Sequence, residues 1–149
     1  MSIRAAIVEF IQYSLEIDRV EEDLNQLIIR LDKLALLASH VEYQFDDADY
    51  PESPGNDYTE VREKIKIRFP ALGHYNTAAE VSVKIGNSTL LIGDAIDDLV
   101  DILCDLKEVL WCFNNTSDNN ALWHFEFGYR SHWGRHLREL QLYLHDRWW

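Results

Sequence analysis

Cysteine, proline and glycine are scarce in this 149-residue chain, which holds two, three and six of them respectively. The two cysteines, Cys104 and Cys112, stand eight positions apart in a segment with helical periodicity. That spacing separates them by about 12 Å and excludes an intrachain disulfide. We therefore expect two reduced thiols in a cytoplasmic protein. Apolar runs of membrane-spanning length are absent too, so no membrane partner is expected.

Basic residues are also few, because 14 Lys and Arg face 26 Asp and Glu for a formal net charge of −12. Nucleic acids and anionic membranes need a basic footprint, so both classes of partner are excluded. The acidic excess suits a basic or cationic protein partner or a small ligand. The sequence also lacks a Gly-rich phosphate loop, a Cys-based metal motif and a nucleophile elbow. These absences favour a protein that is not an enzyme.

Apolar residues recur at helical spacing over most of the chain. Three long stretches carry apolar stripes with alternating steps of three and four residues: 18–44, 92–113 and 121–146. Such stripes are typical of helices that face a core. A shorter stripe covers 61–69 and ends at Pro70, since proline cannot continue a helix. Residues 46–57 combine acids with two prolines and a glycine, which predicts a loop.

The predicted fold is all-α, an antiparallel bundle of about five to six helices that forms a single domain over residues 1–149. We interpret residues 71–89 as a helix or an irregular connector, although three apolar residues alternate there. Gly128 and Gly134 interrupt the last predicted helix, each at a cost of about 1 kcal/mol relative to alanine. Close packing of another helix at these two positions would explain them.

Six carboxylates share one face of the predicted helix 92–113: Asp94, Asp97, Asp98, Asp101, Asp105 and Glu108. We call this set the acidic stripe. It fits an arc of about 100° opposite the apolar residues. Like charges four residues apart repel by roughly 0.2–0.5 kcal/mol per pair. A solvated or ion-paired face is the favoured interpretation, and replacement of Asp101 by asparagine is then expected to leave stability unchanged or slightly raised.

The last predicted helix carries His132 and His136 four residues apart, which is zinc-ligand spacing. Both fall on or beside its apolar face, so a hydrogen-bonded core pair is favoured over a metal site. At least one of them should bind a group on another helix. An acidic partner is expected, and the candidates are Asp94, Asp97, Asp98, Glu42 and Glu16.

Two arginines and a further histidine widen this region into a candidate ligand site. His124, Arg135 and Glu139 share a neighbouring face, where an arginine could grip a carboxylate ligand, although a surface ion pair is favoured. If the acidic partner of the histidines lies in a water-filled cleft, Arg130 or Arg135 could line that cleft. The tentative ligand-binding residues are therefore His124, Arg130, His132, Arg135 and His136.

Four segments carry a resemblance to a known family: GDAIDDL at 93–99, KEVLW at 107–111, ALWHF at 121–125 and SHWGRHL at 131–137. In this order and spacing they resemble the bacterial family known as domain of unknown function 5063. The similarity is densest over 90–140 and looser over 61–75. The resemblance implies an all-helical bacterial domain, with no established activity, ligand or catalytic residue to carry over.

The leading functional hypothesis is a non-enzymatic binding or interaction protein without a cofactor. Its surfaces would be the acidic stripe and the last helix, which is rich in Arg, His and Trp, and a homodimer is also conceivable. The alternative is a divalent-metal-dependent hydrolase of phosphate compounds. In it, Mg²⁺ or Mn²⁺ would be bound by oxygen ligands, with His132 or His136 as acid–base groups. The candidate metal ligands are Asp94, Asp97, Asp98 and Asp101.

Overall fold

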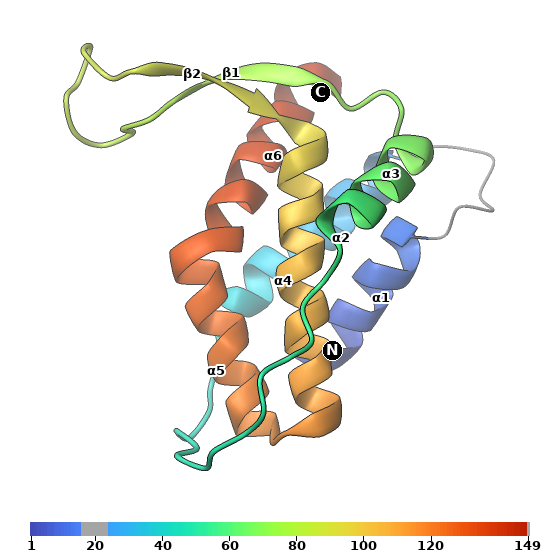
Figure 1. Cartoon of the computed structure of the whole chain (residues 1–149). Helices are drawn as coiled ribbons and strands as arrows, with labels where there is room; N and C mark the ends of the chain where they lie inside the picture. The colour runs from blue at the N-terminus through green and yellow to red at the C-terminus, as the bar shows by residue number, and fades with distance from the viewer. Residues whose placement is uncertain (16–23, 149) are drawn as a thin grey trace.

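The computed structural model describes residues 1–15 and 24–148. Helices dominate these residues, and two short strands form one small antiparallel sheet. In chain order the elements are α1 (Ile3–Leu15), α2 (Leu24–Ala38), α3 (Tyr58–Arg68), β1 (His74–Ala78), β2 (Leu90–Asp94), α4 (Ala95–Asn115), α5 (Asp118–Gly128), the π-helical turn η1 (Tyr129–Trp133) and α6 (Gly134–Trp148). The α5, η1 and α6 segments form one continuous rod antiparallel to α4 (Figure 1). The predicted helical bundle is confirmed, with a sheet added to it.

Helix α4 lies at the centre of the bundle and packs against α1, α3, α5 and α6. Its apolar stripe is buried as predicted, with Leu99, Leu103 and Leu106 fully enclosed. The helix begins at Ala95 rather than at 92. Asp94 ends the preceding strand and caps the helix, since its carboxylate accepts hydrogen bonds from the backbone N–H groups of Ile96 and Asp97 at 3.0 and 3.3 Å.

The second predicted helix ends earlier than its apolar pattern suggests, at Ala38 instead of 44. Two polar side chains close its last turn, because Ser39 and His40 bond back to the carbonyls of Ala35 and Leu36. The predicted start of this helix at 18 lies outside the described residues. The predicted loop over 46–57 is confirmed.

The prediction of a helix or an irregular connector over 71–89 is wrong at 74–78, which form strand β1, whereas 79–89 are an irregular connector that leads to β2. The two strands form a β-hairpin. Tyr75 pairs with Gly93 and Thr77 with Leu91 in the antiparallel register. The first strand, HYNTA, has no apolar alternation of its own and depends on its partner strand, so its sequence carries little strand signal. Gly93 is required in β2, because a Cβ there would lie 2.3 Å from the Tyr75 ring.

The two glycines of the last helix flank the π-helical turn. A Cβ on Gly134 would lie 2.0 Å from the carbonyl oxygen of Tyr129, and one on Gly128 would lie 2.9 Å from the Trp133 ring. These close contacts come from within the same rod, so the expected approach of another helix is wrong at Gly134. At Gly128 a Cβ would also lie 3.8 Å from the Asp105 carboxylate of α4. Short π-helical turns occur frequently at functional sites.

Two expectations from composition can be compared with the structure. Cys104 and Cys112 are both free thiols, as predicted. No helix among the described residues combines the length and apolar character needed to cross a membrane.

Replacement of Gly134 by alanine should destabilise the protein by about 1–3 kcal/mol, because the new methyl group overlaps a backbone carbonyl that cannot move independently. In an ordinary helix the same change stabilises by up to about 1 kcal/mol. The sign of the change in unfolding free energy therefore distinguishes the π-helical turn from a regular helix. Urea unfolding of the two proteins measures the difference. A gain in stability for Gly134→Ala would contradict the need for glycine at the π-helical turn.

Candidate metal centre

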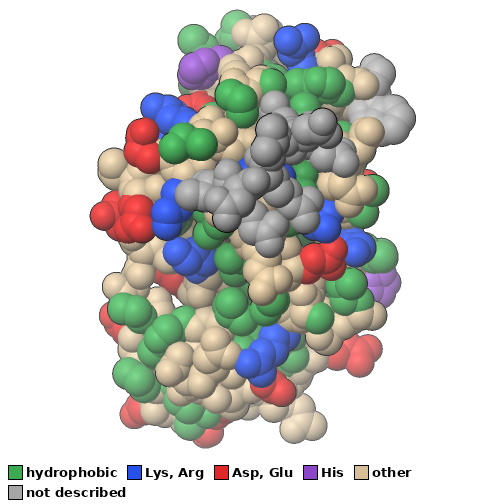
Figure 2. All heavy atoms as spheres, turned by 90° about the vertical axis from the view of Figure 1, so that its right-hand side faces the viewer, with side chains coloured by type: hydrophobic (Ala, Val, Ile, Leu, Met, Phe, Trp, Pro, Cys, Tyr) green, Lys and Arg blue, Asp and Glu red, His purple; other side chains and the backbone are tan. Residues whose placement is uncertain are grey.

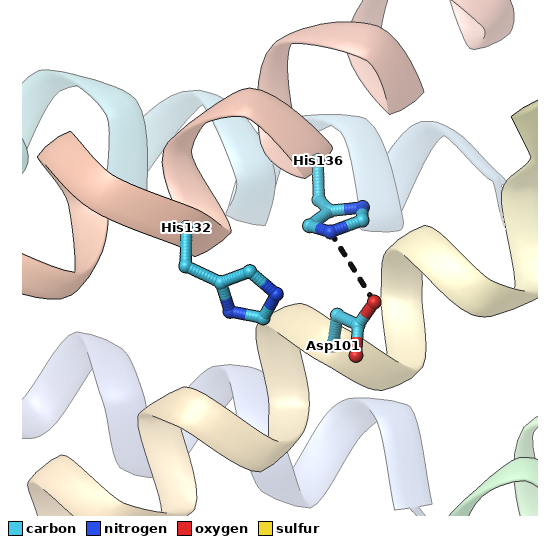
Figure 3. Close-up of side chains that lie close together, drawn as sticks. All are labelled: Asp101, His132 and His136. Atoms are coloured by element: carbon cyan, nitrogen blue, oxygen red, sulfur yellow. Dashed lines mark ion pairs between the residues drawn. The ribbon is translucent and has the colours of Figure 1, made fainter.

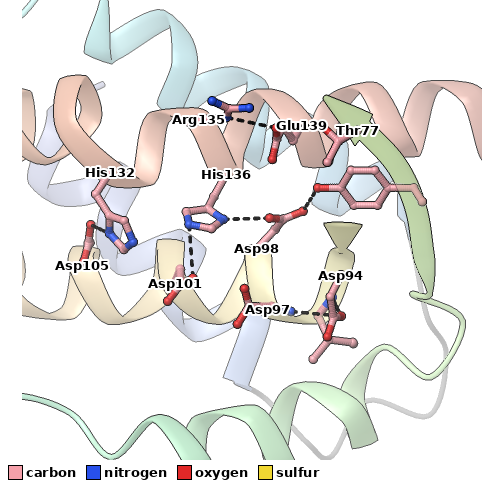
Figure 4. Close-up of polar contacts among 12 residues, drawn as sticks. Thr77, Asp94, Asp97, Asp98, Asp101, Asp105, His132, Arg135, His136 and Glu139 are labelled. Carbon is pink, nitrogen blue, oxygen red and sulfur yellow. Dashed lines mark hydrogen bonds and ion pairs between the residues drawn. The ribbon is translucent and has the colours of Figure 1, made fainter. Parts of the chain in front are cut away.

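Asp98, on the first turn of α4, is buried at 3% exposure and holds two hydrogen bonds. Its carboxylate accepts one from His136 Nδ1 on α6 at 2.7 Å and one from the hydroxyl of Tyr75 on β1 (Figure 4). Burial raises the pKa of Asp98, and these two hydrogen bonds offset only part of that rise. The acidic stripe is therefore not a solvated face at this position, because α6 and the hairpin cover it.

His136 bridges two aspartates of α4. Its Nδ1 atom bonds Asp98, and its Nε2 atom lies 3.2 Å from Asp101 Oδ2. The hydrogen bond to Asp98 and the nearby negative charges raise the pKa of His136 more than burial lowers it. The prediction that an inward histidine contacts a carboxylate of another helix is confirmed, with Asp98 as the partner. The alternative partner Glu16 lies outside the described residues.

His132, on η1 one turn before His136, contacts a further aspartate of α4. Its Nδ1 atom lies 2.8 Å from Asp105 Oδ2, and its side chain is 48% exposed. Asp105 was absent from the predicted site residues. The signal was nonetheless in the sequence, because aspartates and histidines both recur at four-residue spacing on helices that run antiparallel.

Asp101, His132 and His136 converge on one point between the two helices. Each offers one ligand atom, and these atoms all lie within 4.8 Å of one another (Figure 3). We call this set the His–Asp cluster. Burial and the neighbouring Asp97 raise the pKa of Asp101, so the folded protein disfavours a bare negative charge at this position.

The other two predicted metal ligands have different partners. Asp94 caps α4 and forms an ion pair with Arg62 of α3 at 2.8 Å. Burial alone would raise its pKa, but the hydrogen bond from Arg62 and the cap hydrogen bonds lower it below the usual value. Asp97 accepts a hydrogen bond from the hydroxyl of Tyr58 on α3. The four aspartates therefore contact three different neighbouring elements, α3, α6 and β1.

The predicted arginines pair with glutamates of their own helical rod, whereas His124 and His132 line a shared cavity of about 240 Å³. Arg130 is exposed and pairs with Glu126 at 2.8 Å. Arg135 pairs with Glu139 at 3.1 Å, and its guanidinium also donates to the carbonyls at positions 78 and 79 of the hairpin. His124 lines a cavity of about 530 Å³ between α4, α5 and the loop at 48–53. Burial lowers the pKa of His124.

Tyr75 is the contributor that the sequence interpretation missed entirely, because it lies in the segment expected to be a helix or a connector. Its hydroxyl binds Asp98, and nearby on the same strand the Thr77 hydroxyl donates to Glu139 of α6 at 2.9 Å (Figure 4). These contacts fix one face of the hairpin on the bundle beside the cluster.

The profile of the family described as Domain of unknown function (DUF5063) matches residues 7–147. The chain belongs to this family. Among solved structures, it is similar to protein BF1032 from Bacteroides fragilis, a structural genomics target, with 18% sequence identity and a TM-score of 0.75. That match covers 98% of this chain and 89% of the other, and at this identity it shows the fold alone. No curated protein matches the chain.

The raised pKa of His136 predicts how the stability of the protein depends on pH. Because the pKa is raised in the folded state, the charged imidazole stabilises the fold below its unfolded pKa of about 6.5. This contribution is lost as the pH rises through the folded pKa. His136→Asn should therefore cost roughly 1–3 kcal/mol near pH 6 and less at pH 9. Urea unfolding across this range measures the gap, with His145→Asn on the same helix as a control. A gap that widens with pH would contradict the assignment.

Proposed function

We propose that this protein binds a divalent transition-metal ion through Asp101, His132 and His136. The observation that carries the proposal is the orientation of the two imidazoles. Each uses Nδ1 to bind its own aspartate, Asp105 or Asp98, at 2.8 or 2.7 Å. A neutral imidazole that donates from Nδ1 has its lone pair on Nε2, where a metal can bind. Metal-ligating histidines are typically held by a carboxylate in this way.

The spacing of the ligand atoms also fits a metal. Two ligands at 2.0–2.1 Å from a tetrahedral zinc ion lie about 3.3 Å apart. The separation between His136 Nε2 and Asp101 Oδ2 is 3.2 Å. The third ligand atom lies within 4.8 Å of these two, and His132 is half-exposed. A modest rotation of the His132 side chain would therefore complete the site.

The ligand types favour one group of metals. Two imidazoles and one carboxylate suit zinc, iron, nickel and copper, whereas Mg²⁺ and Mn²⁺ prefer oxygen ligands. The proposal therefore departs from the all-aspartate Mg²⁺ or Mn²⁺ site expected from the sequence. Three protein ligands also leave at least one coordination position for water or another molecule.

Electrostatics supports a bound cation at this place. Asp97, Asp101 and Asp105 recur at four-residue spacing on α4, and like charges at that spacing repel. Five of the six stripe carboxylates have partners among the described residues of the chain. A basic protein partner would therefore find few free carboxylates, whereas a single metal ion would offset the repulsion locally.

Metal-dependent hydrolysis is a second candidate function, favoured by the open coordination position. Zinc lowers the pKa of a bound water to about 7 and so makes a nucleophile at neutral pH. The acidic surroundings repel phosphate esters, so a neutral carboxylic ester is the better substrate class.

Addition of Zn²⁺ to metal-stripped protein should raise its melting temperature. At about 100 times the dissociation constant the gain is about 2.7 kcal/mol, or roughly 5–11 °C for a chain of this size. Titration calorimetry should give one Zn²⁺ per chain, and Mg²⁺ should have no comparable effect. His132→Asn and His136→Asn should each abolish the shift, whereas His145→Asn should retain it. Equal Zn²⁺ binding by all four proteins would refute the site.

The variant Asp101→Asn separates binding from folding. Without metal its stability should match or slightly exceed that of the parent, because a charge flanked by Asp97 and Asp105 is removed. With Zn²⁺ it should show none of the parent's stabilisation. A loss of several kcal/mol without metal would instead indicate that Asp101 is a structural ion-pair partner.

The hydrolysis candidate is tested with p-nitrophenyl acetate and the Zn²⁺-loaded protein. Turnover above that of free Zn²⁺ in buffer, lost in Asp101→Asn, is the expected result. Turnover no faster than that of free Zn²⁺ would exclude hydrolysis of this ester and leave metal binding as the proposed function.

A further inference from the structure

One face of the β-hairpin contacts the bundle, and the other is exposed. Tyr75 and Thr77 point from one face toward the bundle, where they bind Asp98 and Glu139. Because side chains alternate along a strand, the neighbouring positions project from the opposite face. On that outward face Leu90 and Ile92 are 72% and 79% exposed.

Polar residues are expected where an antiparallel sheet faces water. Strand β2 instead reads Leu90, Leu91 and Ile92 without interruption. A continuous apolar run is the pattern of a strand covered on both faces. The bundle supplies one cover, so the other face lacks a partner within the described residues.

The exposed apolar surface continues beyond the strands into the hairpin loop. Val81, Val83 and Ile85 are 77%, 58% and 77% exposed. Figure 1 shows this end of the hairpin extending past α6, away from the helices. On the face shown in Figure 2, by contrast, apolar side chains are interspersed with charged ones of both signs. We call the outward strand residues Leu90 and Ile92, together with these three exposed loop residues, the outward hairpin face.

The charge of the patch identifies the kind of partner. The chain as a whole carries −12, which opposes contact between two copies over most of its surface. The charged residues of the hairpin loop, Glu80 and Lys84, pair with each other at 2.9 Å. The hairpin loop is thus locally neutral, and two copies can approach there without charge repulsion.

The size of the patch also suits a second copy. Five aliphatic side chains at this exposure present on the order of 600 Å² of apolar surface. Two such patches would bury on the order of 1,200 Å², which reaches the lower end of stable interfaces. The same patch facing itself across a two-fold axis is the commonest geometry of homodimers.

We propose that the outward hairpin face is a homodimer interface, in which two copies stack their hairpins through Leu90, Ile92 and the apolar loop. The interface is independent of the His–Asp cluster, since those side chains lie on the bundle side of the hairpin. Each copy would keep its own metal site.

Sedimentation equilibrium of the full chain between 1 and 200 µM tests the proposal. The parent should show reversible dimers, and Leu90→Thr/Ile92→Thr should weaken dimerisation at least tenfold. Threonine is β-branched and suits a strand, so folding should be unaffected. Val81→Thr/Val83→Thr should weaken dimerisation by a smaller factor and serves as a second variant. Leu36→Gln, at an exposed position on α2, is the matched control and should dimerise like the parent.

Three outcomes would overturn the proposal. The first is a parent that remains monomeric up to 200 µM, and the second is a dimer that both hairpin variants retain. The third is a monomer that binds phosphatidylcholine vesicles through the hairpin, which would assign the patch to a lipid surface. Far-UV circular dichroism of each variant checks that a lost dimer is not a lost fold.

Discussion

The buried carboxylate of Asp98 joins three parts of the molecule that are distant in sequence. A charge removed from water costs several kcal/mol unless it is paired and hydrogen-bonded. Here the partners come from α6 through His136 and from β1 through Tyr75. The helix pair and the hairpin are therefore coupled, because loss of either partner would leave the buried Asp98 carboxylate with an unsatisfied hydrogen bond. Together with the hydrogen bonds from Thr77 to Glu139 and from Arg135 to the hairpin carbonyls, this group positions the sheet on α4 and α6.

The antiparallel alignment of α4 with the last helical rod turns this contact into a cluster. Because His136 also contacts Asp101, the four-residue spacing of Asp101 and Asp105 on α4 matches that of His136 and His132 on the rod and brings His132 to Asp105. Asp101 then lies close to both imidazoles. The π-helical turn carries His132, and the glycines that flank it allow the backbone and Trp133 to approach closely. A local irregularity in the helix thereby helps to position the group that completes the proposed metal site.

The two faces of the hairpin have different roles. Its polar side chains on the bundle side bind Asp98 and Glu139, and Asp98 in turn binds His136 of the cluster. Its apolar outward face makes no such contribution and is available to a second chain. A ribbon of two strands is marginal on its own, so its anchoring to the bundle is what permits it to present that face.

The apolar periodicity alone predicted the helical bundle, because apolar residues that recur every three to four positions are a local sequence pattern of helices that face a core. It also placed the two histidines on the inward side of their helix and identified the aspartate face of α4. The periodicity did not predict the hairpin, since β1 is stabilised by pairing with residues 12 to 20 positions away and not by a pattern of its own. The burial of Asp98 and the pairing of Asp105 with His132 were likewise decided by tertiary structure. A helix pattern shows which residues share a face, but only packing decides which neighbouring element covers that face.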